Sequence, residues 1–213
     1  MKPLKTAVAE SLARAPIIAV VRHADRAVAA GQARAFMRHG LEMIEVTFTV
    51  PGATELVREL LDLRPAGSAI RIGMGTVTTP ARARAAVAAG SEFLVTPNVS
   101  AAVAGIAHDN ALFLCMGGLT PSELVAAHEL GADLLKVYPL PPVGGPAYLA
   151  VVRQPLGDLA PMLAGGGFGI EEIPAYRAAG AVAFGIGAPL LAPDEEATSR
   201  NIHRALALAR GGQ

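Results

Sequence analysis

The chain has 213 residues, of which 52% are hydrophobic and 17% charged, and its formal net charge is zero. This composition argues against a disordered chain and against binding of nucleic acid through a basic surface. No run of about 18 uncharged apolar residues occurs, so we expect no membrane span and a cytoplasmic protein. The sole cysteine, Cys115, lies in an apolar run, where we expect it to be a buried small hydrophobe.

Residues 1–15 are expected to form an N-terminal helix. After them, short apolar runs recur at fairly even spacing, and each is followed by Gly, Pro or Thr and then by an alanine-rich stretch. This pattern is typical of repeated strand-loop-helix units. The predicted strands span residues 17–21, 43–47, 70–74, 93–96, 112–116, 134–138, 161–164 and 182–186. The seventh is the weakest, because Pro161 limits its pairing.

Helix signals lie between the predicted strands. Two segments carry apolar residues at the spacing of one helix face: Ala53, Leu56, Val57 and Leu60, and Ile202, Ala205, Leu206 and Ala209. Thr79-Pro80 and Thr120-Pro121 are typical helix starts, the second with a capping box completed by Glu123. Glycines predict the helix ends that precede four of the strands, at Gly40, Gly90, Gly131 and Gly180.

Eight strands that alternate with helices predict an α/β protein with one (β/α)₈ TIM barrel over residues 1–213. In such barrels the active groups lie at the carboxyl ends of the strands and in the loops that follow. Most of the unusual residues of this chain fall at those positions.

Lys136 is the only lysine after residue 5 and lies in an apolar run from Leu134 to Tyr138. A guanidinium stays protonated in proteins, whereas a desolvated lysine amine can lose its proton and attack a carbonyl carbon. Lys136 is therefore the first candidate for a Schiff-base residue.

Glu45 is the candidate partner of Lys136. Because side chains alternate along a strand, Ile44 and Val46 are expected to face the helices and Glu45 the barrel interior. The same rule places Lys136 and Tyr138 inside. We therefore assign proton transfer to Glu45, while a purely structural ion pair with Lys136 stays open as the alternative.

Two glycine clusters follow the last two predicted strands, at residues 165–167 and at Gly185 and Gly187. Backbone N–H groups in such loops often bind phosphate in barrels of this kind, although turns alone explain many glycine clusters. Arg22 and Thr76 follow the first and third strands and could together hold an acid substrate. Alternatively, Arg22 balances Glu45 and Thr76 caps the next helix.

The five histidines show no metal-ligand spacing, and no dinucleotide or Walker motif is present. We therefore expect no metal and no other cofactor.

The ordered motifs along the chain resemble those of the class I pyruvate aldolases. They include residues 44–51, 73–77, 95–98 (Val95-Thr96-Pro97-Asn98), 119–124 and 135–139. That family cleaves 2-keto-3-deoxy-6-phosphogluconate, 2-keto-3-deoxy-6-phosphogalactonate or 4-hydroxy-2-oxoglutarate. The resemblance implies a Schiff base on Lys136, proton transfer by Glu45, and release of pyruvate and an aldehyde, with 2-keto-3-deoxy-6-phosphogluconate as the first candidate substrate. A cytoplasmic homotrimer is implied as well.

The resemblance also implies which residues contact the substrate. Arg22 and Thr76 match positions that contact the substrate acid, and Gly166, Gly167 and Gly187 match the backbone phosphate site. Thr96 and Pro97 belong to the matching motif after the fourth strand.

Several positions depart from the family pattern. Gly165, Ala188 and Gly117 stand where members commonly carry threonine, serine and proline, and Thr49 stands where some carry a carboxylate-binding arginine. Two substrate-contacting hydroxyls are thus missing. Each neutral hydrogen bond contributes about 0.5 to 1.5 kcal/mol, so the phosphate site is weakened but not abolished.

Other functions use the same residues. A keto-acid aldolase acting on unphosphorylated substrates needs no phosphate site. A phosphosugar isomerase or epimerase would use Glu45 as its base and Lys136 only for its charge. A non-catalytic barrel that only binds keto acids is suggested by Gly165 and Ala188.

Overall fold

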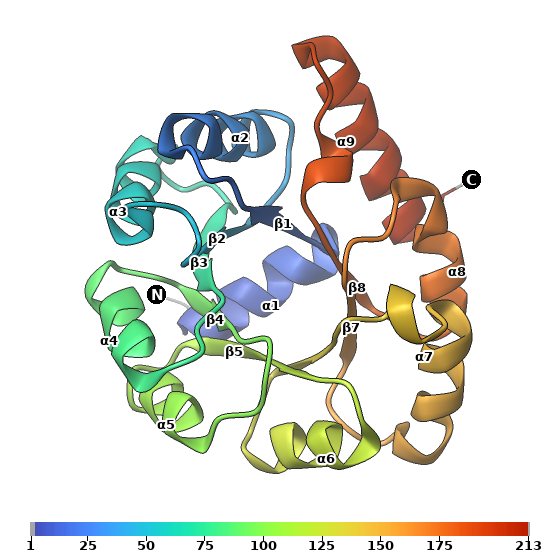
Figure 1. Ribbon diagram of the computed structural model, residues 1–213. Coiled ribbons are helices and arrows are strands. Elements are labelled where there is room, and N and C mark those ends of the chain that lie inside the picture. The colour runs from blue at the N-terminus through green and yellow to red at the C-terminus, as the bar shows by residue number, and fades with distance from the viewer. Residues whose placement is uncertain (1–2, 213) are drawn as a thin grey trace.

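The computed structural model describes residues 3–212. Within them, eight parallel strands pair in the order β1 to β8 and close into a barrel, with helices around the outside (Figure 1). The predicted TIM barrel is confirmed. The strands are β1 (Ile17–Val21), β2 (Met43–Thr47), β3 (Arg71–Gly75), β4 (Phe93–Val95), β5 (Phe113–Gly118), β6 (Leu134–Val137), β7 (Met162–Gly165) and β8 (Ala183–Ile186).

Strand bounds agree with the pattern to within one or two residues. The strands β1 and β2 have the predicted bounds, whereas β3 and β5 start one residue later than predicted and extend into glycine. The strand β7 starts at Met162 rather than at Pro161, which lacks the N–H that a strand position would use.

Helices and short 3₁₀ turns connect the strands. The helices are α1 (Leu4–Arg14), α2 (Arg26–Arg38), α3 (Ala53–Leu63), α4 (Pro80–Ala88), α5 (Ala101–Asp109), α6 (Pro121–Glu129), α7 (Pro146–Arg153), α8 (Ile173–Ala178) and α9 (Glu195–Arg210). The turns are η1 (Pro141–Val143), η2 (Gln154–Leu156), η3 (Ile170–Glu172) and η4 (Ala188–Leu190). Within residues 3–212, no helix has the length and apolar character needed to cross a membrane.

The predicted helix ends are confirmed. Thr79 accepts a hydrogen bond from the backbone of Arg82, and Thr120 and Glu123 form the capping box. The four predicted terminating glycines all have positive φ angles, which glycine adopts at little cost: Gly40, Gly90, Gly131 and Gly180.

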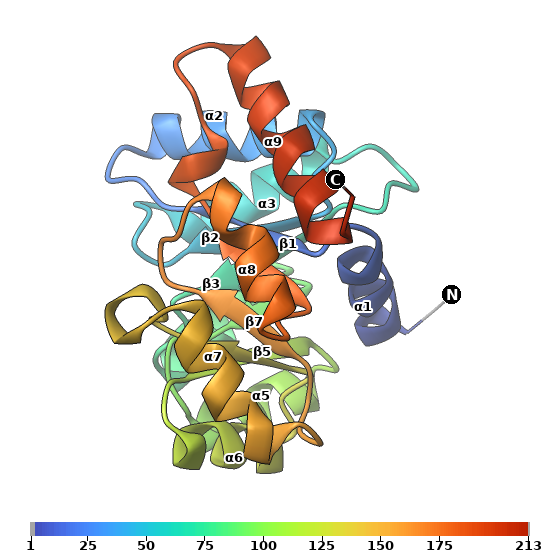
Figure 2. The same ribbon diagram turned by 90° about the vertical axis from the view of Figure 1, so that its right-hand side faces the viewer.

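The helix α1 closes one end of the barrel (Figure 2). Val8 and Leu12 pack against apolar side chains of the barrel interior. Lys5 forms an ion pair of 3.0 Å with Asp133, which lies just before β6. These contacts put α1 at the amino ends of the strands, so the site must lie at the opposite end.

Side chains of the strands alternate between two packed regions. Ile44, Val46, Leu135 and Val137 face the surrounding helices, as predicted, and belong to the large outer core. The inner region holds a smaller apolar cluster that includes Ile18, Met43, Phe93, Cys115, Leu134 and Leu163. Above this cluster, towards the carboxyl ends, the inward positions include Glu45, Lys136, Gly165 and Gly185.

The apolar stripe of α3 supplies a matched test of the packing. Leu60 is fully buried and Leu63, in the same helix, is 57% exposed. Leu60→Ala should lower the free energy of unfolding by about 2 to 5 kcal/mol, because it removes buried methyl groups and leaves a cavity. Leu63→Ala should change it by no more than about 0.5 kcal/mol. Urea unfolding measures both, and equal losses would contradict this packing.

Candidate active site

A cavity of about 350 Å³ lies at the carboxyl ends of β1, β6, β7 and β8. Its polar lining consists of side chains from α2 and β6 and from the residues that directly follow β1 and β6: Arg22, Gln32, Lys136 and Tyr138. Its remaining lining consists of apolar and glycine residues: Val20, Phe168, Ile186, Ala188 and Pro189, and Gly165, Gly166, Gly167, Gly185 and Gly187. Two cations thus face a wall rich in glycine.

Lys136 reaches this cavity from the middle of β6. Its strand neighbours Leu135 and Val137 are fully buried, whereas Lys136 itself is only half-buried. A Cβ atom placed on Gly165 would lie 3.2 Å from the Cε atom of Lys136, so the glycine leaves room beside the lysine stem. The amine nitrogen lies 5.0 Å from the centre of the Tyr138 ring, at cation–π distance.

Glu45 projects from β2 into the same interior. It is 2% exposed, and its Oε1 atom has no hydrogen-bond partner among residues 3–212. The carboxyl group lies over Gly75, where any Cβ atom would collide with Oε1. Burial raises the pKa of Glu45 above its usual range, while the positive charges of Lys136 and Arg22 act in the opposite direction.

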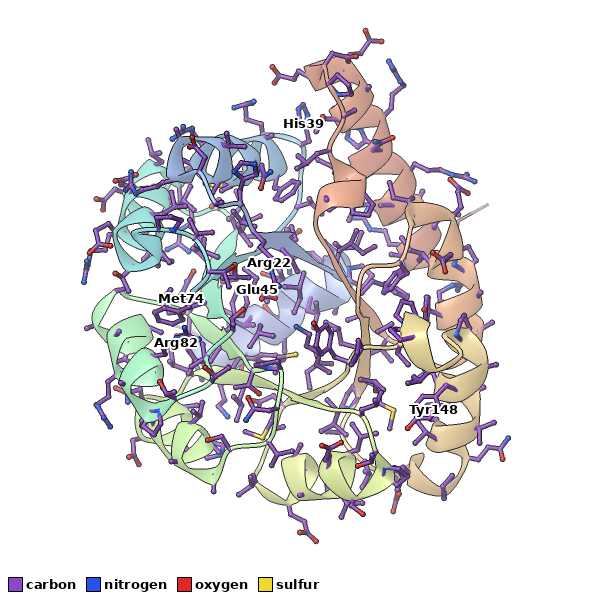
Figure 3. The ribbon with its side chains drawn as sticks, viewed as in Figure 1. Arg22, His39, Glu45, Met74, Arg82 and Tyr148 are labelled. Atoms are coloured by element: carbon purple, nitrogen blue, oxygen red, sulfur yellow. The ribbon has the colours of Figure 1, made fainter. Side chains whose placement is uncertain are left out.

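Glu45 and Lys136 interact through space without a direct ion pair. In the described part of the chain, neither residue has an oppositely charged group within 4.0 Å. The alternative of a structural ion pair is therefore wrong. Figure 3 shows Arg22 close to Glu45 near the barrel axis, in line with its electrostatic effect on that carboxyl group. The amine and the carboxyl are both left unpaired and could meet a ligand.

The glycine loops present unused backbone donors. Gly166 and Gly167 have φ angles of +131° and +86°. Backbone atoms of neighbouring segments leave no space for a side chain at Gly166 or Gly187. Among the described residues, the N–H groups of Gly167, Phe168 and Ala188 find no acceptor. Such free amides at the ends of two adjacent strands are suited to an anion.

Three predicted contact residues lie outside the cavity lining. Thr76, Thr96 and Pro97 follow β3 and β4, on the side of the barrel opposite β7 and β8. The hydroxyl of Thr96 donates to the backbone carbonyl of Asn98 and accepts from the N–H of Gly117. Thr96 thus ties the loop after β4 to the strand β5. Arg22, which was expected to act with Thr76, instead lines the cavity with the glycine loops.

Thr76 has an unusual backbone. Its φ angle is +59°, a region that β-branched residues rarely enter. The next helix is capped by Thr79 and not by Thr76, so the capping alternative is wrong. Strained residues of this kind cluster at functional sites, and Thr76 directly follows the glycine that underlies Glu45.

Sequence reasoning missed part of the site. Gln32, Phe168 and Pro189 line the cavity, but none follows a recognisable motif. The available signal for Gln32 was weak: it is the one uncharged polar side chain in an alanine-rich segment that also carries three arginines. The role of Gly75 as the floor beneath Glu45 was missed too, because it depends on the register of β2 and β3.

Cys115 plays no visible part in the cavity. It is fully buried, as predicted, and burial raises the pKa of its thiol to about 12. Such a thiol is a poor nucleophile near neutral pH.

The chain was compared with known families and structures. The family model described as "KDPG and KHG aldolase" matches residues 8–205. KDPG and KHG denote 2-keto-3-deoxy-6-phosphogluconate and 4-hydroxy-2-oxoglutarate. The chain belongs to the KDPG and KHG aldolase family. It is accordingly a class I, pyruvate-dependent carbon–carbon lyase.

Individual family members show the same relationship. A probable 2-dehydro-3-deoxy-6-phosphogalactonate aldolase of Rhizobium meliloti is 33% identical, over 84% of this chain and 82% of the relative. The 4-hydroxy-2-oxoglutarate/2-dehydro-3-deoxyphosphogluconate aldolase from TTHB1 is 30% identical, with a TM-score of 0.79 over 98% of this chain and 99% of that structure. The KDPG aldolase of Legionella pneumophila, 23% identical, has a TM-score of 0.73 over 99% of this chain and 97% of that structure. Its structure holds pyruvate as a covalent carbinolamine.

The raised pKa of Glu45 makes a prediction about stability. As the pH rises above about 4.5, the ordinary value, the carboxyl group ionises first in the unfolded chain, while the folded chain keeps the proton until its higher pKa is passed. Ionisation of Glu45 therefore destabilises the folded state in this window. We expect Glu45→Gln to become progressively more stable than the wild type as the pH rises through it.

Urea unfolding at a series of pH values measures this difference, and Glu55→Gln is the control. Glu55 is exposed, and a backbone hydrogen bond lowers the pKa of its carboxyl group. Its substitution should therefore give a small trend of opposite sign that lies below about pH 4.5, and no trend above it. A pH-independent difference for Glu45→Gln would show that its carboxyl group is not destabilised by burial.

Proposed function

We propose that the enzyme cleaves 2-keto-3-deoxy-6-phosphogluconate to pyruvate and glyceraldehyde 3-phosphate through a Schiff base on Lys136. The observation that carries the proposal is the unpaired amine of Lys136 in the cavity. The buried carboxyl group of Glu45 is also unpaired, and the charge of Lys136 lowers its pKa against the effect of burial. The carbinolamine found in the Legionella pneumophila relative supports a covalent step of this kind.

The chemistry follows from these two groups. The amine of Lys136 attacks the C2 carbonyl of the keto acid, and loss of water leaves an iminium ion. The base takes the proton of the C4 hydroxyl as the C3–C4 bond breaks; the aldehyde leaves, and the bonding electrons move into the iminium to form an enamine. Protonation at C3 and hydrolysis then release pyruvate and restore the amine.

Glu45 is assigned the proton transfers. A carboxyl group whose pKa is raised by burial holds a proton more readily than an ordinary exposed glutamate and so is better suited to both accept and return one. The aromatic ring of Tyr138 beside the amine adds a favourable surface for the cationic iminium.

The two halves of the barrel mouth would hold the two ends of the substrate. Thr76, Thr96 and Pro97 follow the neighbouring strands β3 and β4. By resemblance, they are assigned to the keto-acid end. The free amides of Gly167, Phe168 and Ala188, together with the glycines Gly166 and Gly187, are assigned to the phosphate at the distal end. The resemblance assigns Arg22, like Thr76, to the substrate acid. Because Arg22 lines the cavity together with the glycine loops and its planar guanidinium group suits a phosphate, we assign it to the distal end instead.

A second substrate is favoured by one observation. The Rhizobium meliloti relative, 33% identical over most of both chains, carries the name of a 2-dehydro-3-deoxy-6-phosphogalactonate aldolase. Gluconate and galactonate derivatives differ in configuration at C4, the carbon that becomes the aldehyde. Pyruvate release from both 6-phosphorylated epimers, compared with 4-hydroxy-2-oxoglutarate, decides between them. A homotrimeric assembly and a cytoplasmic location stay predictions.

Covalent trapping tests the role of Lys136. Incubation with pyruvate and borohydride should attach a reduced pyruvyl group to Lys136, because only an imine is reduced to a stable amine. Lys5, which is held in an ion pair with Asp133, is the internal control and should stay unmodified. Peptide mass spectrometry locates the adduct.

The variant Lys136→Arg keeps the charge but cannot form an imine, so it should lose the adduct and lower pyruvate release by a factor of about 1000 or more. Substantial activity in this variant would contradict covalent catalysis and favour a site in which the lysine supplies charge alone.

A further inference from the structure

The polar side chains that line the cavity share one property. Within residues 3–212, Arg22, Gln32, Lys136 and the hydroxyl of Tyr138 have no hydrogen-bond or ion-pair partner in the protein. Two arginines of α2 outside the cavity are paired, Arg26 with Glu59 and Arg38 with Glu195. Unused polar groups concentrated in one cavity are groups left for a ligand. The catalytic proposal uses three of them and leaves Gln32 without a role.

Gln32 has a defined place in this cavity. It lies in the middle of α2, next to the stripe of Ala29, Ala33 and Phe36 that packs against the barrel, and is itself half-buried. The same cavity is lined by Arg22 at the end of β1 and by Ala188 and Pro189 after β8. Gln32 thus belongs to the distal half, where residues 165 and 188 offer no hydroxyl group.

We infer that Gln32 is a specificity-determining residue that donates its side-chain amide N–H to the phosphate at the distal end of the substrate. This inference rests on the proposed function. A carboxamide supplies two N–H donors, so one side chain from α2 can take the place of hydroxyls absent from the β7 and β8 loops. The amide is neutral, so it contributes an oriented hydrogen bond, while the positive charge of the site comes from Arg22.

Gln32 also borders a second groove, between α2 and the segment from Leu191 to Glu195. That groove offers no competing anion site. Its cation, Arg38, is paired with Glu195 at 3.0 Å, and Asp194 adds a further negative charge to its lining. A phosphate is therefore directed to the side of Gln32 that faces Arg22 and the free amides.

The test compares substrates with and without the phosphate. Gln32→Ala should lower kcat/KM for the 6-phosphorylated 2-keto-3-deoxy acids by about tenfold, equivalent to about 1.4 kcal/mol, mainly through KM. The unphosphorylated acids should change by less than about twofold. Gln32→Glu should lose more than Gln32→Ala with the phosphorylated acids, because a carboxylate repels the phosphate. Gln154→Ala, an exposed glutamine outside the cavity, is the matched control and should leave all substrates unchanged.

A binding measurement separates this inference from the catalytic proposal. Calorimetry with glycerol 3-phosphate, which cannot react, should give a Kd about tenfold higher for Gln32→Ala than for the wild type. Pyruvate trapping on Lys136 should be equal in both proteins. Equal loss for phosphorylated and unphosphorylated acids, equal Kd values, or full activity of Gln32→Glu would each overturn the role of Gln32. Absence of the pyruvate adduct in the wild type would instead overturn the catalytic proposal.

Discussion

The site depends on a carboxyl group that is buried without a hydrogen bond to its Oε1 atom and faces two positive charges. A buried carboxylate is costly unless something compensates its charge, and here Lys136 and Arg22 do so only at a distance. The arrangement keeps both the acid and the amine available. A direct ion pair between them would be more stable locally but would occupy the lone pair and the proton that catalysis needs.

Two features of the barrel make this arrangement possible: the register of its strands, and glycines that leave space beside Glu45 and Lys136. Glu45 pairs in register with Val20 on one side and Gly73 on the other, and Lys136 pairs with Gly117 and Leu163. Alternation then turns both side chains inward, above an apolar layer closed from below by α1. Gly75 leaves room for the carboxyl group of Glu45, and Gly165 leaves room beside the stem of Lys136.

Much of this could be predicted from the sequence, because periodicity and caps are local signals. The apolar runs, the threonine caps and the terminating glycines placed the strands and helices to within a residue or two, and alternation turned Glu45 and Lys136 inward. Contacts between distant segments could not be predicted in this way. Gln32 was missed because its helix packs beside the loop after β8, and the lining that Arg22 shares with the glycine loops depends on the pairing of β1 with β8.

The central claim is that Lys136 forms the imine and Glu45 moves the protons. Exchange of the methyl protons of pyruvate in deuterated water tests it most directly, because exchange requires both the imine and the base. The wild type should exchange these protons. Glu45→Gln should still form the borohydride-trapped adduct, but its exchange rate should fall by a factor of about 100 or more. Exchange at the wild-type rate in Glu45→Gln would contradict the account.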